Sequence, residues 1–324
     1  MSLSLARSAF FGQRTGPVVV VVMDGVGIGP DYAGNAVKAA TTPVLKRLMA
    51  DYQHTALRAH GTAVGMPSDA DMGNSEVGHN ALGAGRIFDQ GAKLVQEALD
   101  SGALFRGPGW NEIIDNCLAR TSTLHLLGLF SDGNVHSHIK HLKALIVEAK
   151  KRGVAKVAIH ALLDGRDVGE TSALEYTEPF EAWLASVDPR YGIASGGGRM
   201  WLTMDRYAAD WSMVERGWHT HVLGQGPRFP SASAAVKALR ETRPGVLDQD
   251  LPEFVIARDG QPFAPVCDGD SVVLFNFRGD RAIEISKAFL DQQPSGVPFD
   301  RIRQPQVCFA GMMTYGHASW SNRR

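Results

Sequence analysis

The chain has 324 residues, of which 44% are hydrophobic and 21% are charged, and its 33 basic and 34 acidic residues give a net charge of −1. This composition is typical of a globular protein with a sizeable core and excludes a disordered chain. The balanced charge argues against nucleic-acid binding, and the longest apolar run, Val18 to Met23, is too short to cross a membrane. Three isolated cysteines, Cys117, Cys267 and Cys308, indicate no disulfide framework, so we expect a cytoplasmic protein.

The first fifty residues predict an extension, a strand and a helix. Residues 1–16 indicate an N-terminal extension. The segment from Pro17 to Met23 predicts a buried strand, because a continuous valine run suits a parallel sheet that is covered on both faces. Thr42 and Pro43 predict the N-cap and first residue of a helix that ends near Asp51.

A glycine-rich loop over residues 61–73 separates this part from a long alternating region. Asn74 predicts the N-cap of a helix that carries Ser75. We then expect strands at 123–130, 156–163, 271–277 and 306–310, helices at 139–152, 172–186, 231–243 and 281–292, and a helix that ends with 211–217. This alternation predicts an α/β fold with a mainly parallel sheet.

Four predicted strands run directly into polar segments that contain glycine. These segments begin at Asp24, Ser131, Asp164 and Asn276. Ligands of open α/β sheets bind beyond the carboxyl ends of the strands. We therefore expect these four loops to line the functional site.

Asp24 and Ser75 have both chemical and purely structural interpretations. Asp24 follows a predicted strand, where a carboxylate either binds a hard cation or accepts hydrogen bonds from the glycine loop after it. Ser75 begins a predicted helix, whose N-terminus favours an anion and helps to ionise a nucleophile. A serine in the first turn of a helix is also a common structural residue.

Three histidines, His136, His138 and His141, follow a predicted strand and could serve as acid–base groups or metal ligands. No carboxylate or cysteine stands beside them at a ligand spacing. We expect one functional histidine, His136, with His138 and His141 on an exposed helix face.

Arginines form the strongest signal. Five of them lie in or near loops rich in Gly or Asp, namely Arg166, Arg199, Arg206, Arg278 and Arg281. Guanidinium groups bind phosphate and carboxylate in a bidentate manner, so the set predicts a pocket for a small, doubly anionic substrate. Asp164 and Asp167 would either orient these guanidinium groups or contact a substrate hydroxyl.

At these residues the chain resembles the cofactor-independent (2,3-bisphosphoglycerate-independent) phosphoglycerate mutases, in the variant of plants and trypanosomatids. The matching segments are 21–25, 61–65, 73–80, 131–137, 164–167, 198–206 and 276–281. They are long, they follow one order, and the similarity extends from about residue 17 to 313.

The resemblance implies an isomerase of glycolysis that interconverts 3- and 2-phosphoglycerate through a phosphoserine on Ser75. It implies two divalent metal ions, typically Mn²⁺, no added 2,3-bisphosphoglycerate, and a monomer whose only partner is the small substrate. Asp24 and Ser75 match ligands of one metal. The substrate-binding positions are His136, Arg166, Asp167, Arg199, Arg206, Arg278 and Arg281.

The resemblance also implies an incomplete alkaline-phosphatase-like domain that is interrupted by an inserted α/β phosphotransferase domain. The expected segments are the extension 1–16, the first part of the phosphatase-like domain at 17–90, the inserted domain at 91–305, and a truncated return at 306–324. The motifs with which family members complete their metal sites do not occur here. The resemblance therefore implies a C-terminally truncated chain and leaves open whether it is active alone.

Two other interpretations remain open at this point. The chain could be a different phosphatase or phosphomutase of the alkaline-phosphatase superfamily. It could also be a non-catalytic remnant that binds phosphoglycerate, or a subunit that a separate polypeptide completes.

Overall fold

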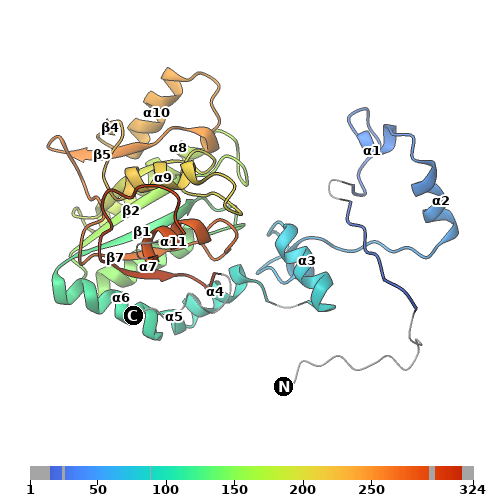
Figure 1. Ribbon diagram of the computed structural model, residues 1–324, viewed down its shortest axis with the longest axis horizontal. Coiled ribbons are helices and arrows are strands. Elements are labelled where there is room, and N and C mark those ends of the chain that lie inside the picture. The colour runs from blue at the N-terminus through green and yellow to red at the C-terminus, as the bar shows by residue number, and fades with distance from the viewer. Residues whose placement is uncertain (1–14, 24–25, 88, 292–295, 316–324) are drawn as a thin grey trace. The chain divides into compact units, whose positions relative to one another are not determined.

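The computed structural model describes residues 15–23, 26–87, 89–291 and 296–315 (Figure 1). Its internal contacts divide the chain into two units, Met1–Leu57 and Arg58–Arg324, which are described separately here. Within the described ranges, every helix is too short or too polar to span a lipid bilayer.

The first unit contains helices α1 (Ala36–Ala39) and α2 (Pro43–Asp51). The sequence prediction for α2 is confirmed, with Pro43 in the first turn. The strand predicted at residues 17–23 is wrong, because the described part of this segment forms no ladder and the side chain of Val20 is 78% exposed. A strand needs a neighbouring backbone for its hydrogen bonds, and the described residues of this unit supply none.

The second unit is built on one eight-stranded sheet. The strands are β1 (Thr123–Phe130), β2 (Lys156–Leu163), β3 (Gly192–Gly198), β4 (Arg228–Phe229), β5 (Phe254–Arg258), β6 (Gln261–Pro262), β7 (Ser271–Leu274) and β8 (Cys308–Gly311). Their order is β4-β5-β3-β2-β1-β7-β8, with β6 paired to β5. Only β5 pairs antiparallel with its neighbours β3 and β6, so the predicted α/β fold with a mainly parallel sheet is confirmed.

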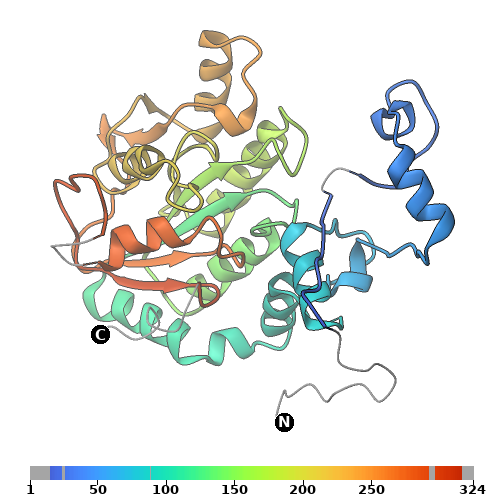
Figure 2. The ribbon, with the colours of Figure 1, turned by 45° about the vertical axis from the view of Figure 1, so that its right-hand side comes forward.

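Helices cover both faces of this sheet (Figure 2). One face carries α6 (Pro108–Arg120), α7 (Ile139–Lys151), α8 (Ala173–Val187) and α10 (Ala232–Thr242), and the other carries α9 (Trp211–His221) and α11 (Ile283–Leu290). Phe130 and Phe180 lie in the first core layer, and Trp218 and Phe289 lie in the second. Each large apolar side chain buried in this way stabilises the fold by about 2 kcal/mol.

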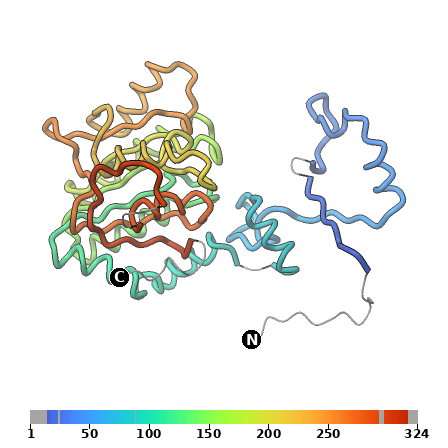
Figure 3. Tube along the Cα trace, viewed as in Figure 1, coloured from blue at the N-terminus to red at the C-terminus, as the bar shows by residue number. Residues whose placement is uncertain are grey.

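The remaining elements precede the sheet or connect its strands, and Figure 3 traces the path of the chain between them. They are η1 (Gly61–Val64), α3 (Ser75–Ala84), α4 (Gly91–Asp100), α5 (Ala103–Arg106) and η2 (Asp248–Asp250). Asn74 caps α3 as predicted, since its side chain accepts a hydrogen bond from the Val77 amide at 3.2 Å.

The sequence did not predict α4, α5, α6, β4, β5 or β6, and two further elements differ from the prediction. Helix α9 begins at Trp211, whereas the predicted helix ended near Gly217. Strand β3 was not predicted, because four of its seven residues are glycines, which disfavour strands. Gly196 has a packing reason, since a Cβ atom there would lie 2.4 Å from the carbonyl oxygen of Ala161.

The predicted domain boundary at residue 90 stays a prediction. Residues 58–90 pack on the sheet unit, where Val64 and Met66 share a small core with Val95 and Phe277. At the other end, β8 pairs with β7, and the Tyr315 hydroxyl donates to the Leu274 carbonyl at 3.0 Å.

Limited proteolysis tests this division. We expect trypsin to cut first in the irregular, exposed segment around Arg58 and to leave a resistant fragment that retains β1 through β8. Mass spectrometry of the digest identifies the fragment. Cleavage between β7 and β8 before cleavage at Arg58 would contradict the inclusion of β8 in the stable sheet.

Candidate functional site

The strand order creates a topological switch between β1 and β7. The chain proceeds from β1 to β2 and β3 on one side, while β7 and β8 lie on the other side of β1. Loops at the carboxyl ends of these strands border the crevice in which α/β proteins bind ligands. The loops predicted to begin at Ser131, Asp164 and Asn276 lie here, and a further loop follows β3. Asp24 lies outside the described residues.

Asp164 organises the loops after β1, β2 and β3. Its buried carboxylate accepts hydrogen bonds from the Ser131 hydroxyl at 2.6 Å and the Asp167 amide at 3.0 Å. It also accepts from Arg199 Nη1 at 2.8 Å, and Asp167 pairs with the same guanidinium group. Arg199 is only 1% exposed, so these carboxylates compensate a buried cation.

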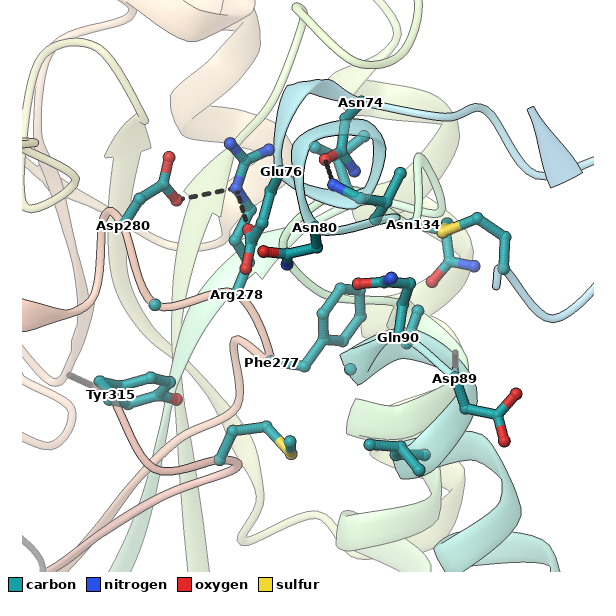
Figure 4. Close-up of a pocket in the computed structure, with 18 of the residues that line it drawn as sticks. Asn74, Glu76, Asn80, Asp89, Gln90, Asn134, Phe277, Arg278, Asp280 and Tyr315 are labelled. Atoms are coloured by element: carbon teal, nitrogen blue, oxygen red, sulfur yellow. Dashed lines mark hydrogen bonds and ion pairs between the residues drawn. The ribbon is translucent and has the colours of Figure 1, made fainter. Parts of the chain in front are cut away.

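Arg278 joins the loop after β7 to helix α3. Its Nε atom lies 2.8 Å from Glu76 Oε2 and 3.0 Å from Asp280 Oδ1, so two carboxylates flank one guanidinium group (Figure 4). Asp280 also lies 3.7 Å from Arg206 Nη1. A separate hydrogen bond joins the loop after β1 to the loop before α3, because Asn134 Nδ2 donates to Asp71 Oδ1 at 2.5 Å.

Arg281 is buried beside the other arginines. Its Nη1 atom donates to the Met204 carbonyl at 2.6 Å, which ties the segment before α11 to the loop after β3. Burial, together with the positive charges of Arg199 and Arg206, lowers the pKa of Arg281 below its usual value. Arg166 adds a further repulsion, although its own side chain is exposed.

His136 lies among these cations and is neutral. Its side chain is buried, and its carbonyl accepts a hydrogen bond from the Phe277 amide at 2.8 Å. Burial and the nearby charges of Arg199, Arg278, Arg281 and Arg206 hold the pKa of His136 well below its usual value. A neutral imidazole can donate one hydrogen bond and accept another without adding charge to the site.

Two buried polar atoms of the cluster lack a hydrogen-bond partner within the described part of the chain. They are His136 Nδ1 and Arg199 Nε. Such atoms are uncommon inside proteins, because an unmade hydrogen bond leaves the desolvation of its group uncompensated. Both lie among arginines at one edge of the sheet, where an unused donor such as Arg199 Nε suits a bound anion.

A pocket of about 390 Å³ adjoins this cluster (Figure 4). Glu76, Asn134, Arg278 and Asp280 line it on one side. The remaining wall is partly apolar and includes Phe277. The volume suits a small molecule rather than a polymer.

Ser75 begins α3 next to this pocket, and its side chain is exposed. The Ser75 hydroxyl lies 3.2 Å from His79 Nδ1, one helical turn further along. Glu76, the next residue, is the one that pairs with Arg278. The structure thus connects the N-terminus of α3 to the arginine cluster through the neighbour of Ser75.

The described residues do not form a metal centre. They contain no group of three or more His, Cys, Asp or Glu side chains placed to hold an ion. The Ser75 hydroxyl is the one expected metal ligand within the described ranges, and a single hydroxyl is too weak a donor set.

Sequence reasoning missed the two carboxylates that compensate Arg278. Asp280 lies within the matched segment 276–281, and Glu76 follows Ser75 directly. The sequence predicted no role for either carboxylate. The exposed position expected for His141 is wrong, since it is 2% exposed and hydrogen-bonds to Gln96 of α4 at 3.1 Å. Helix α4, which covers it, was not predicted.

Comparison with known proteins places this site in a family. Residues 95–317 match the family model for the N-terminus of 2,3-bisphosphoglycerate-independent phosphoglycerate mutase. A probable mutase of this type from Leptospira interrogans is 56% identical over 97% of the chain, and one from Trypanosoma brucei brucei is 48% identical over 97%. The chain spans 57% of the length of each of these relatives.

A solved structure gives the same result. Phosphoglycerate mutase from Leishmania mexicana, determined at low cobalt concentration, matches with a TM-score of 0.87 and 49% identity. The match covers 91% of this chain and 54% of that protein. The chain therefore belongs to the family of 2,3-bisphosphoglycerate-independent phosphoglycerate mutases and matches the N-terminal part of its members.

Proposed function

We propose that this chain binds 3-phosphoglycerate and 2-phosphoglycerate and takes part in their interconversion, without 2,3-bisphosphoglycerate. The observation that carries the proposal is the cluster of arginines around neutral His136 at the switch point. Phosphoglycerate carries a phosphate and a carboxylate on three carbons. Closely spaced guanidinium groups, among them Arg199 with an unused Nε donor, can hold both anionic groups at once.

The residues divide into anion-binding and orienting roles in this proposal. Arg278 and Arg281 bind the substrate together with Arg199, Arg206 and Arg166. Asp164 fixes Arg199, while Asp167, at 13% side-chain exposure, is placed to exchange a proton with a glycerate hydroxyl. His136 donates a hydrogen bond to the glycerate without adding charge.

Ser75 is the proposed phosphoryl acceptor. Its Oγ atom forms a bond to phosphorus as the bond from phosphorus to the 3-oxygen of glycerate breaks. The Ser75 proton is released, and the glycerate oxygen takes up a proton. The reverse sequence at the 2-oxygen returns the phosphoryl group and leaves Ser75 unchanged. Exposure of Ser75 at the N-terminus of α3 supports this role.

The predicted domains extend the proposal. We infer that residues 17–90 and 306–324 belong to an alkaline-phosphatase-like domain, and that residues 91–305 form an inserted phosphotransferase domain. In favour of this inference, β1 to β7 and the helices that cover them lie between residues 91 and 305, whereas β8 continues the same sheet beyond residue 305. The two Mn²⁺ ions, of which one has Asp24 and Ser75 as ligands, and the monomeric state remain predictions.

Arg278→Ala tests the anion site. We expect the affinity for 3-phosphoglycerate to fall about tenfold or more, because a charge-assisted hydrogen bond contributes about 1.5–3 kcal/mol. Isothermal titration at low salt measures it. The control is Arg120→Ala, an exposed arginine at the end of α6, which should bind like the unmodified chain. Equal affinity for 3-phosphoglycerate in both variants would show that Arg278 does not bind the substrate.

Ser75→Ala tests the phosphoryl acceptor. After incubation with 3-phosphoglycerate and Mn²⁺, mass spectrometry should find phosphate on Ser75 of the unmodified chain and none on the variant. Ser68→Ala, in the loop before α3, is the matched control and should still become phosphorylated. Conversion of 3- to 2-phosphoglycerate that survives Ser75→Ala would refute the assignment.

Asp164→Asn tests the carboxylate that joins three loops. The amide keeps the size of the side chain but leaves buried Arg199 undercompensated, so we expect a loss of about 3 kcal/mol in the free energy of unfolding. Urea denaturation measures this loss. Asp132→Asn, at an exposed carboxylate in a neighbouring loop, should change it by less than about 1 kcal/mol. A similar loss of unfolding free energy in both variants would show that Asp164 does not organise the three loops.

A further inference from the structure

A chain of buried polar side chains crosses the sheet on the face covered by α9. It consists of Asp270, His125, His160, Ser195, His221 and Thr203. The distances between successive polar atoms are 3.1, 2.9, 2.7, 2.7 and 2.9 Å. Every member is at most 6% exposed. None of these six residues belongs to the proposed anion site.

The carboxylate of Asp270 sets the direction of every bond in this chain. Burial alone raises the pKa of Asp270, but hydrogen bonds from His125 and from the Thr123 and Cys267 amides outweigh it and lower the pKa. Asp270 is therefore ionised and can only accept, so His125 donates through Nε2 and must accept at Nδ1.

The remaining links follow from this assignment. His160 donates from Nε2 to His125 and accepts at Nδ1 from the Ser195 hydroxyl. Ser195 accepts from His221 Nδ1, which leaves His221 Nε2 as the acceptor for the Thr203 hydroxyl. Burial keeps all three imidazoles neutral and lowers the pKa of His221 to about 3. The Thr203 hydroxyl is thus a donor whose acceptor is fixed.

Thr203, at the end of this chain, has a strained backbone. Its φ angle is +70°, and the Met204 amide donates to the Leu202 carbonyl at 2.8 Å, which makes Thr203 the centre of a tight γ-turn. This form of turn is rare, and a β-branched residue adopts positive φ at a steric cost. Surrounding contacts must therefore hold it. Besides the bond to His221, the Thr203 amide donates to the Met213 carbonyl at 2.7 Å.

Helix α9 has a glycine where Thr203 packs against it. A Cβ atom on Gly217 would lie 2.1 Å from the Thr203 hydroxyl oxygen. Glycine weakens a helix interior, so its presence here reflects the space that the turn requires. The turn is consequently enclosed between the sheet and α9 in one position.

The turn lies between two arginines of the proposed site. Arg199 precedes it and Arg206 follows it, while Arg281 donates to the carbonyl of Met204, the residue after Thr203. We propose that Thr203 is a positioning residue, whose hydroxyl, anchored through His221 to the chain that ends at Asp270, holds the strained turn and thereby places Arg206 and Arg281. This inference rests on the proposed binding of phosphoglycerate.

Thr203→Val tests the proposal, because valine keeps the shape of the side chain and removes the donor. We expect the affinity for 3-phosphoglycerate to fall about fivefold, and the backbone amides of residues 204–208 to exchange hydrogen faster in the unliganded chain. Thr203→Ser keeps the hydroxyl and should restore both. Titration calorimetry and hydrogen exchange with mass spectrometry measure the two quantities.

Two further variants separate positioning from stability. Leu126→Ala creates a cavity in the core layer on the opposite face of the sheet and should lower the melting temperature without changing affinity. Ser195→Ala breaks the chain away from Thr203 and should weaken binding in the same direction as Thr203→Val. If Thr203→Val does not fold, the affinity of Ser195→Ala for 3-phosphoglycerate tests whether the buried chain positions the turn.

The outcomes are distinct. Unchanged affinity and exchange in Thr203→Val, or an equal loss of affinity in Leu126→Ala, would overturn the proposal. If the unmodified chain does not bind 3-phosphoglycerate, the proposed function fails instead. The exchange of residues 204–208 in unliganded Thr203→Val then decides alone whether the hydroxyl holds the turn.

Discussion

Mutual repulsion between guanidinium groups is the constraint on which this site depends. Arg199, Arg206, Arg278 and Arg281 lie close enough to lower the pKa of His136, and such proximity is unfavourable in a buried setting. Carboxylates with fixed positions make the arrangement possible. Removal of one partner from a buried ion pair leaves an uncompensated charge, and the stability lost is then larger than the intact pair contributes. The charged residues of the cluster must therefore assemble as a unit.

The sheet supplies the geometry that brings these charges together. Because β1 has β2 on one side and β7 on the other, loops from distant parts of the sequence meet at one edge. A backbone hydrogen bond from Phe277 to His136 joins two of them directly. Asp164 joins the loop after β1 to the loops after β2 and β3, so a single carboxylate holds three loops together.

The sequence predicted the parts of the molecule that depend on local patterns. The strands β1, β2 and β7, the capped helix after Asn74, and the arginines in polar loops all carry short-range signals. Strand β3 was not predicted, because glycines usually disfavour strands. In the folded protein, close packing of neighbouring backbones requires glycines such as Gly196. The buried state of His141 depends on α4, and the exposure of Val20 depends on the absence of a pairing strand among the described residues of its unit.

The sequence did not predict the hydrogen bonds between buried polar residues that lie far apart along the chain. His125, His160 and His221 stand far apart along the chain, and nothing local marks them as members of one hydrogen-bonded series. The sequence also gives no indication of the positive φ angle of Thr203, because threonine ordinarily avoids this conformation. Such features arise from packing around a site and have to be read from the folded structure.

A crystal structure of the 324-residue chain soaked with 3-phosphoglycerate would locate the anion site. We expect the ligand at the carboxyl ends of β1, β2 and β7, with its anionic groups on Arg278 and Arg281 and its glycerate beside His136. Density for the ligand at any other surface, with those arginines in contact only with protein carboxylates, would contradict this expectation.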